Sequence, residues 1–375
     1  MKVVHIASGD TWGGAERVLA LLAEDINEQA DCSVEVLLFN EGRLADRLRG
    51  SGLEVDVMPE SKLSFPRLAC AVRRWLDRRR PDVVHAHRYK EILATALAIA
   101  PRKRGFVATV HGLEPSQQLT RGRAVLIWGS LVAAKLAGAQ VVTVSSELTH
   151  RLQRVLGHKR IVHIPNPMPP VGDSKNFPNL RQKFGWTSSR PLVGFVGRLE
   201  KVKGPDIFVE VAARCQTDAG FVLVGGGSLA RELSAHVTAA GLTGRVAFLG
   251  EVPDAAPYIR QFNVLALPSR HEGLPLVLLE AAASAVPVVA FEVGGVREVL
   301  HRSGPGARLV APTDENAFRA AVEAFLRDPE RSRLEAIQGA ESIRAEFSLA
   351  TIASAYRDVY RIAARSEECE RSHLA

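Results

Sequence analysis

Cysteine is scarce in this sequence of 375 residues, and its positions follow no pattern. Cys32, Cys70, Cys215 and Cys369 form no CxxC pair and lie near no run of histidines at metal-ligand spacing. Disulfide frameworks and structural metal sites need cysteine or histidine at short, regular spacings. The sequence therefore predicts a protein of a reducing compartment without a structural metal, and the cytoplasm is the expected location.

Long hydrophobic runs are also missing. Met1–Ala7 is much shorter than the apolar core of a signal peptide, and it predicts a first strand. The longest apolar stretch, 124–144, contains Lys135 and Gln140. Because a membrane-spanning helix needs about 20 mostly apolar residues, we expect a buried helix followed by a strand in this stretch.

Aromatic residues make up 6% of the chain, whereas 46% is hydrophobic and 24% charged, as in ordinary globular proteins. The net charge of +7 is concentrated in residues 43–104, where fifteen Lys and Arg outnumber seven acids. Arg73–Arg74 and Arg78–Arg80 could bind an anionic membrane surface or an acidic acceptor, or form solvated helix ends. Without a recognition motif or interleaved aromatics, the basic region does not indicate nucleic-acid binding.

Apolar, strand-like runs alternate with helical patterns along most of the chain, with one interruption at the proline-rich segment 165–172. This alternation predicts parallel sheets with helices on both faces. Two doubly wound α/β domains joined near 166–190 also suit the length of the chain. The expected strands are Val3–Ala7, Ser33–Phe39, Glu54–Val57, Val83–Ala86, Phe106–Val110, Val141–Val144, Ile161–Ile164, Leu192–Val196, Phe221–Val224, Val246–Leu249, Val264–Leu267, Val288–Ala290 and Ala307–Val310.

The stretch 269–280 is the strongest candidate for a site. Pro275 is expected at the first position of a helix, which would leave the amides of Leu276 and Val277 free to bind an anion. Glu272 lies before this helix and Glu280 inside it, so both could face one crevice. One carboxylate could meet a reacting group while the other holds hydroxyls. The alternative is one surface glutamate and one on an amphipathic helix.

Two loops of the first half follow predicted strands. Trp12-Gly13-Gly14-Ala15-Glu16 opens the first helix, and its paired glycines could leave amides free for a phosphate or simply form a tight turn. His111 ends another strand and could stabilise developing charge or cap the strand. His85 and His87 have the same two interpretations, and we favour a structural role for His85.

Two further loops belong to the second half. In Gly197–Gly204, Arg198 and Lys203 are suited to a diphosphate, although they could also be surface charges at a helix entry. Gly225–Ala230 satisfies GxGxxG/A after a strand, and Glu251 follows the next strand, which also fits a dinucleotide-binding fold.

Taken together, these motifs resemble the retaining glycosyltransferases of family 4, which have the two-domain GT-B fold. Their order and spacing hold from about residue 1 to residue 312, with Ala285-Val286 standing where the family often has Ala-Gly. The matching segments are Gly13–Glu16, Asp82–His87, His111-Gly112, Ile164–Pro167, Val196–Arg198 with Lys203-Gly204, Val224–Gly227, Phe248–Gly250, Glu272 with Glu280, Pro287–Ala290 and Gly294-Gly295.

The resemblance implies two Rossmann-like domains that face each other across a central cleft. The acceptor-side domain would comprise 1–168, with a C-terminal helix at about 349–365 packing back on it, and the nucleotide-sugar domain would comprise 169–348. The reaction would move a hexosyl group, with retention, from a nucleotide diphosphate sugar to a saccharide or lipid-linked acceptor in the synthesis of cell-surface polysaccharides or glycoconjugates. No cofactor or metal is expected, and the sequence contains no DxD motif.

The same resemblance assigns roles to individual residues. The expected catalytic residues are His111, Glu272, Arg198 and Lys203. The expected donor-binding residues are Gly13, Gly14, Gly197, Arg198, Lys203, Gly225, Gly250, Glu251, Gly273, Leu274, Leu276, Val277 and Glu280. The expected acceptor-side residues are Trp12, His87, Arg88 and His111. The enzyme would work in the cytoplasm, either free or peripheral at the inner face of the membrane.

Other functions compete with glycosyl transfer. A nucleotide-sugar epimerase, a phosphorylase or an NAD-linked oxidoreductase could use a Rossmann-like scaffold, and a sugar-binding protein could close around a ligand without turnover. A retaining glycosidase needs two flanking carboxylates, and Glu272 has no obvious second acid.

Overall fold

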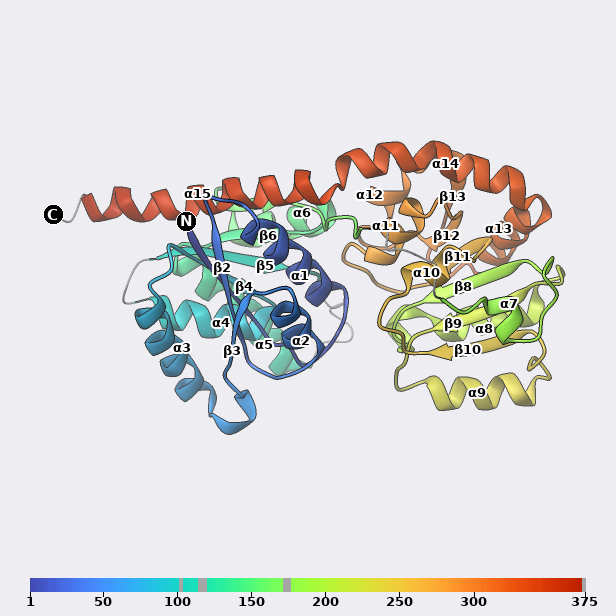
Figure 1. The fold of residues 1–375 in the computed structure, drawn as a ribbon, viewed down its shortest axis with the longest axis horizontal. Coiled ribbons are helices and arrows are strands. Elements are labelled where there is room, and N and C mark those ends of the chain that lie inside the picture. The colour runs from blue at the N-terminus through green and yellow to red at the C-terminus, as the bar shows by residue number, and fades with distance from the viewer. Residues whose placement is uncertain (101–103, 114–119, 171–176, 373–375) are drawn as a thin grey trace. The chain divides into compact units, whose positions relative to one another are not determined.

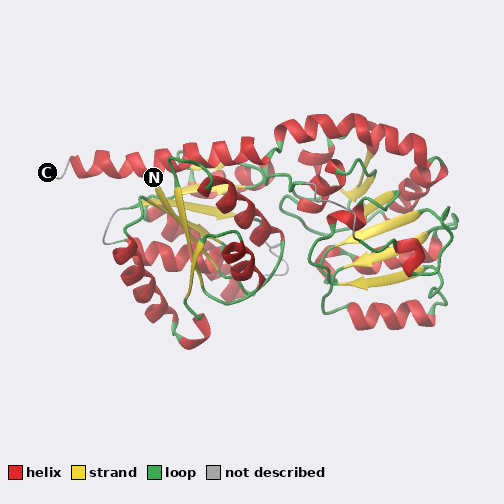
Figure 2. Cartoon of the chain, viewed as in Figure 1, coloured by secondary structure: helices red, strands yellow, loops and turns green. Residues whose placement is uncertain are grey.

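The chain divides into two compact units, Met1–Pro167 with Leu349–Ala375 and Met168–Ser348 (Figure 1). The computed structural model describes all residues except 101–103, 114–119, 171–176 and 373–375. Each unit has its own parallel sheet, and helices flank both sheets (Figure 2). The two series of strands predicted from the alternating pattern are therefore confirmed.

The sheet of the first unit has the strand order β3-β2-β1-β4-β5-β6-β7. Its described strands are β1 (Lys2–Ala7), β2 (Ser33–Leu38), β3 (Glu54–Val57), β4 (Val83–His87), β5 (Gly105–Val110), β6 (Gln140–Thr143) and β7 (Ile161–His163). The helices of this unit are α1 (Gly14–Asn27), α2 (Arg43–Gly50), α3 (Phe65–Arg79), α4 (Tyr89–Ile99), α5 (Arg121–Leu136), α6 (Ser146–Leu156) and α15 (Leu349–Ser372). The order reverses between β1 and β4, which is where doubly wound sheets bind ligands.

The sheet of the second unit has the order β10-β9-β8-β11-β12-β13. Its described strands are β8 (Leu192–Val196), β9 (Gly220–Val224), β10 (Val246–Gly250), β11 (Val264–Leu267), β12 (Val288–Phe291) and β13 (Ala307–Val310). Its helices are α7 (Leu180–Lys183), α8 (Pro205–Arg214), α9 (Ala230–Ala239), α10 (Ala256–Ile259), α11 (Leu276–Ala283), α12 (Val296–Leu300), α13 (Glu315–Arg327) and α14 (Pro329–Glu346). Here the strand order reverses between β8 and β11. The loop with Arg198 and Lys203 follows β8, and the loop with Glu272 follows β11.

The last helix belongs to the first unit although it follows the second in sequence. Helix α15 packs against β5 and α1, and it buries Tyr356 and Tyr360 completely. These phenol rings lie beside His85. The C-terminal helix therefore completes the core beneath the carboxyl ends of β4 and β5.

Helix α5 differs from the sequence prediction. The apolar stretch predicted a buried helix, but α5 exposes Val125, Val132 and Leu136 to 73%, 46% and 82%. These residues share one helix face, since they are spaced by seven and four residues. Composition could not separate a buried helix from one with an apolar face toward solvent. No helix in the described ranges is long and apolar enough to cross a bilayer.

Candidate functional site

The cationic loop of the second unit lies at the carboxyl end of β8. Its last turn is a short 3-10 helix, Lys201–Lys203, and α8 follows directly. The Arg198 carbonyl accepts from the Glu200 amide, whereas its exposed side chain makes no hydrogen bond or ion pair with any residue that the structure describes. Its guanidinium is therefore available to a ligand.

Lys203 contacts Glu272 directly. Its Nζ lies 2.8 Å from Oε1 and 2.7 Å from Oε2 of Glu272, whose side chain is only 4% exposed. An ammonium centred on both oxygens of a buried carboxylate fixes its position. The structure thus brings together two residues predicted to be catalytic, one from the loop after β8 and one from the loop after β11.

Glycines allow the backbones of these loops to approach one another closely. Gly204, at φ +70°, has the carbonyl oxygen of Pro268 only 2.1 Å from where a Cβ would lie. Gly294, at φ +55°, would meet the carbonyl oxygen of Glu272 at 1.9 Å. A side chain at either position would displace the loop that carries Glu272.

The glycines after β9 have a similar structural explanation. A Cβ on Gly225 would lie 2.0 Å from the carbonyl oxygen of Gly197, and one on Gly227 would lie 2.6 Å from that of Leu199. Loop packing thus accounts for the GxGxxG-like pattern without a dinucleotide. Gly226 faces the side chain of Glu251, and the Gly225 amide donates to the Gly250 carbonyl.

The start of α11 offers unused backbone donors. The amides of Leu276 and Val277 donate no hydrogen bond to the described residues, and no side chain caps this helix. Pro275 is the N-cap residue, so the predicted helix start was wrong by one position. Glu280 is buried within α11. Free amides at a helix start favour an anionic ligand.

The remaining predicted donor residues lie in the same loops. Gly273 is half-buried and its carbonyl accepts from the Gly295 amide, whereas Leu274 is buried. Both lie between Glu272 and the start of α11.

Two supporting interactions were not recognised in the sequence. Arg270 forms a bidentate ion pair with Asp206 at 2.8 Å and 2.7 Å, and its guanidinium also donates to the Lys201 carbonyl. Glu200 accepts from both the amide and the hydroxyl of Ser228, which lowers the pKa of Glu200. The only sequence signal was charge in loops already singled out.

In the first unit, the glycine-rich loop after β1 is bound to Arg88. The Glu16 carboxylate accepts from the Gly13 amide at 3.0 Å and pairs with Arg88 at 2.5 Å. Arg88 also donates to Thr11 and has a left-handed backbone at φ +65°. Such strain persists where the surroundings enforce it and is common at functional sites. Trp12 is half-buried in the same loop, and Gly14, the first residue of α1, is exposed.

Histidines from β1, β4 and the end of β5 form one group, in which His5, His85 and His87 are buried and His111 is half-buried. His87 Nδ1 lies 3.2 Å from His111 Nε2, and His87 Nε2 lies 3.0 Å from His5 Nδ1. Burial lowers the pKa of His5 and of His111 to about 3 and lowers those of His85 and His87 well below the usual value. All four imidazoles are therefore neutral at pH 7.

His5 was missed in the sequence, although a polar residue inside the apolar strand 2–7 was a usable signal. Ligand atoms of His5, His85 and His87 lie within 4.8 Å of one another, close enough to consider a metal. Both ring nitrogens of each histidine, however, already have hydrogen-bonding neighbours. The geometry is that of a hydrogen-bonded network.

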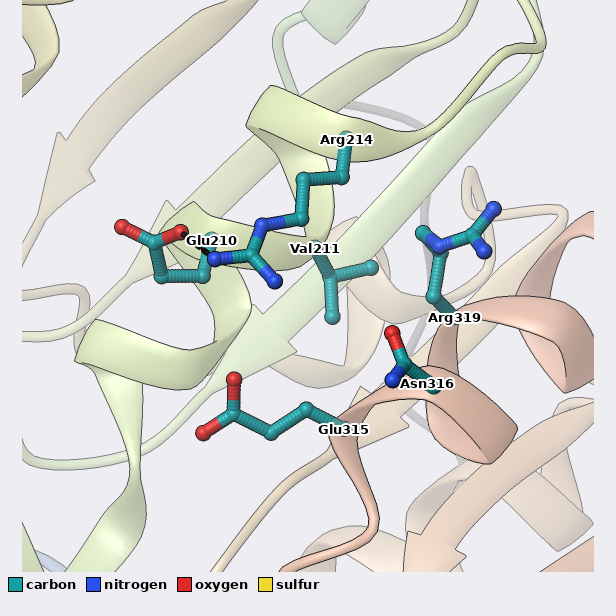
Figure 3. A pocket seen from close by; sticks show the side chains of 6 residues that line it. All are labelled: Glu210, Val211, Arg214, Glu315, Asn316 and Arg319. Carbon is teal, nitrogen blue, oxygen red and sulfur yellow. Dashed lines mark ion pairs between the residues drawn. The ribbon is translucent and has the colours of Figure 1, made fainter.

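A surface hollow between α8 and α13 is a separate feature (Figure 3). Charged side chains dominate it, and Glu210 pairs with Arg214 at 3.2 Å. None of the predicted site residues lines it. This hollow is therefore not the predicted donor site.

Comparisons with known proteins agree with the motif series. Residues 12–170 match the family described as Glycosyltransferase Family 4, and residues 190–328 match the one described as Glycosyl transferases group 1. An alpha-maltose-1-phosphate synthase from Mycolicibacterium smegmatis is 30% identical over 313 residues, covering 74% of this chain and 78% of that protein. The lipopolysaccharide core biosynthesis mannosyltransferase LpcC from Rhizobium leguminosarum bv. viciae is 35% identical over 179 residues. That match covers 46% of this chain and 51% of LpcC, about half of each.

Solved structures show the same architecture. Anabaena Alr3699/HepE in complex with UDP superposes with a TM-score of 0.81 at 22% identity, over 96% of this chain and 99% of that one. WaaG, a glycosyltransferase involved in lipopolysaccharide biosynthesis, superposes with a TM-score of 0.73 at 16% identity, over 96% and 99%. Together with the family matches, these likenesses show that the chain is a GT-B glycosyltransferase and belongs to the group 1 glycosyltransferases of family 4.

Proposed function

We propose that this protein transfers a hexosyl group from a nucleotide diphosphate sugar to a saccharide or lipid-linked acceptor, with retention at the anomeric carbon. The observation that carries the proposal is the Lys203–Glu272 pair. Arg198 lies in the same loop as Lys203, and its side chain, like the first amides of α11, bonds to none of the described residues. Two cations and amide donors match a diphosphate, and a fixed carboxylate matches sugar hydroxyls. Solved relatives described as complexes with UDP and with UDP-glucose support a nucleotide sugar as the donor.

In this proposal, the second unit holds the donor. Arg198 and Lys203 bind the diphosphate together with the Leu276 and Val277 amides, and Glu280 binds the ribose hydroxyls. Glu272 holds the sugar ring with the amides of Gly273 and Leu274. The glycine-rich loops at Gly197, Gly225 and Gly250, with Glu251, form the rest of the donor-binding site in this unit.

The first unit supplies the acceptor side. The proposed ligand contacts of this unit are His111, Gly13 and Gly14. Trp12, His87 and Arg88 complete the acceptor side. The ion pair between Arg88 and Glu16 keeps the glycine-rich loop next to the end of β4.

The chemistry follows from charge that develops on the leaving group. The bond between the anomeric carbon and the diphosphate oxygen breaks, and a bond to the acceptor oxygen forms on the same face of the sugar. The departing phosphate oxygen takes the proton of the acceptor hydroxyl. Preorganised cations and amides stabilise the leaving diphosphate as its charge develops, and this is the role that we propose for Arg198 and Lys203 without a metal.

A membrane-bound acceptor is also part of the proposal. Three exposed arginines, Arg67, Arg74 and Arg78, lie on one face of α3 because they are spaced by seven and four residues. Helix α4 packs against both α3 and α5, and α5 carries the exposed apolar side chains. Basic side chains on α3 and apolar side chains on α5, the two helices that pack against α4, match an anionic lipid surface. Arg73 instead donates to the backbone carbonyls of Leu97 and Ala98, and Arg79 pairs with carboxylates that include Asp56.

The test is donor turnover by Arg198→Ala and Lys203→Ala, with and without a saccharide acceptor. Both variants should remain folded and lose about 100-fold or more in kcat, as removal of a charge-stabilising donor does elsewhere. Lys183→Ala, an exposed lysine of the same unit, is the matched control and should keep full activity. Near-normal turnover by both site variants would reject the proposal, and equal turnover without acceptor would indicate an epimerase or hydrolase.

A further inference from the structure

A continuous series of hydrogen-bonded polar groups, here called the histidine relay, runs from α15 to His111. Its members in order are Tyr356, Thr109, His85, Tyr360, His5, His87 and His111. The heavy-atom distances along it are 3.3, 2.7, 2.8, 3.5, 3.0 and 3.2 Å. The longest step joins the Tyr360 hydroxyl to His5 Nε2.

The first member of the relay sets the direction in which its hydrogen bonds are donated. Among the described residues, the buried Tyr356 hydroxyl has Thr109 Oγ1 as its one hydrogen-bonding neighbour. Burial raises the pKa of Tyr356 to about 12, so the phenol keeps its proton. A buried hydroxyl that donates to nothing is costly. Tyr356 therefore donates to Thr109.

The later bonds follow from the number of protons that each group carries. Thr109 accepts from Tyr356 and so donates to His85 Nε2. A neutral imidazole has one N–H and one acceptor nitrogen, and the His85 proton is therefore on Nδ1 and points to Tyr360. Repeating this step through Tyr360 and His5 places the His87 proton on Nδ1, directed at His111 Nε2.

His111 is the last member of this relay, and its donor has no partner among the residues that the structure describes. Its Nε2 accepts from His87, so its proton must be on Nδ1. His111 Nδ1 is buried and has no hydrogen-bond partner among the described residues. An N–H that bonds to nothing in the described part of the protein is available to donate to an oxygen of a bound ligand.

We propose that this relay is a positioning device which holds His111 in the Nδ1–H tautomer and so presents a hydrogen-bond donor to the ligand. Tyr356 and Tyr360 of the C-terminal helix are then positioning residues that act through the histidines. That the ligand is a nucleotide diphosphate sugar rests on the proposed function, whereas the tautomer of His111 does not.

The test is nitrogen NMR of protein labelled with ¹⁵N-histidine, without ligand, at pH 7.5. The His111 signals, assigned by their loss in His111→Gln, should show a protonated Nδ1 and an unprotonated Nε2. In Tyr360→Phe the link between His85 and His5 is cut, and in Tyr356→Phe the fixed first donor is lost. Both variants should move the two His111 nitrogen signals toward averaged values, whereas Tyr258→Phe in the other unit should not.

Activity gives a second measurement. Tyr360→Phe should lower kcat by at least about tenfold with little change in donor KM, as a wrong tautomer does at a functional histidine. A proton on His111 Nε2 in the unmodified protein would overturn the relay, as would unchanged His111 signals in both tyrosine variants. One equivalent of zinc in the purified protein would also overturn it. Predicted signals without any glycosyl transfer would leave the relay intact and reject the proposed function.

Discussion

Lys203 Nζ lies within 2.8 Å of both carboxylate oxygens of Glu272, although the two residues are 69 positions apart in the sequence. The pair joins the loop after β8 to the loop after β11, which is the point where the strand order of this sheet reverses. Each partner fixes the other before a ligand arrives. Preorganisation of this kind lowers the cost of binding and of charge stabilisation.

Removal of the Glu272 charge should weaken both folding and catalysis. Glu272→Gln leaves Lys203 next to a neutral amide, and we expect a loss of about 1–3 kcal/mol in the free energy of unfolding. Donor turnover should fall by about tenfold or more because the lysine is no longer held in place. Urea unfolding and steady-state kinetics measure the two effects. Glu210→Gln, whose side chain is 38% exposed, is the control, and equal behaviour of the two variants would contradict the role of the pair.

The close contact of Gly294 with the Glu272 loop makes a second prediction. Gly294→Ala should destabilise the protein by more than about 2 kcal/mol, since a Cβ would add a backbone clash to the cost of a left-handed conformation. Gly241 has a similar φ of +68° but open space around it. Gly241→Ala should therefore cost only about 1 kcal/mol. Denaturant midpoints of the two variants test the difference, and equal losses would contradict the contact.

A buried carboxyl in α4 predicts a pH dependence of stability. Burial raises the pKa of Glu91 from 4.5 to about 7. The folded state then holds a proton that the unfolded chain releases, so this group's stabilisation is full below pH 4.5 and is lost as pH rises to about 7. The loss corresponds to about 3 kcal/mol.

The pH effect is measured as a difference between proteins, because the buried histidines titrate in the opposite sense. Glu91→Gln should unfold at the same urea concentration as the unmodified protein near pH 5. Above pH 7 the variant should be the more stable of the two. A constant difference between them from pH 5 to pH 8 would show that Glu91 does not hold the proton.

The arginines on α3 predict binding to anionic vesicles. Basic residues at a charged bilayer contribute about 1 kcal/mol each, so a triple Arg67→Gln, Arg74→Gln and Arg78→Gln variant should bind roughly 100-fold more weakly. Binding should also weaken with salt. Co-sedimentation with phosphatidylserine vesicles tests both effects. Equal loss in a variant with Lys183, Arg231 and Arg327 changed to glutamine would show that the attraction is only that of net charge.

Much of the fold could be predicted because it follows from the local pattern of apolar and polar residues. Alternating apolar strands and amphipathic helices fix a parallel sheet, and glycines after strands mark the loops at its carboxyl edge. Lys203 and Glu272 could be placed in such loops for this reason. Their direct contact could not be predicted, because it depends on β8 and β11 being neighbours in the sheet.

The histidine relay could not be predicted from the sequence for a similar reason. His85 and Tyr360 are 275 positions apart, and only the folding of α15 onto β5 brings them together. The exposed face of α5 was predicted to be buried because apolar residues favour burial, but their sequence does not identify the surface that would cover them. The bidentate pair of Arg270 and Asp206 likewise depends on tertiary structure.

The most direct test of the account is the binding of nucleoside diphosphates and their sugars to the unmodified protein and to the Arg198→Ala, Lys203→Ala double variant. A ligand bound only by the folded protein raises its Tm, by an amount that corresponds to about 2.7 kcal/mol at 100 times Kd. We predict a clear rise in Tm for at least one nucleotide sugar in the unmodified protein and in Lys183→Ala, and none in the double variant. An equal rise in all three proteins would contradict the central claim that these two cations bind the diphosphate.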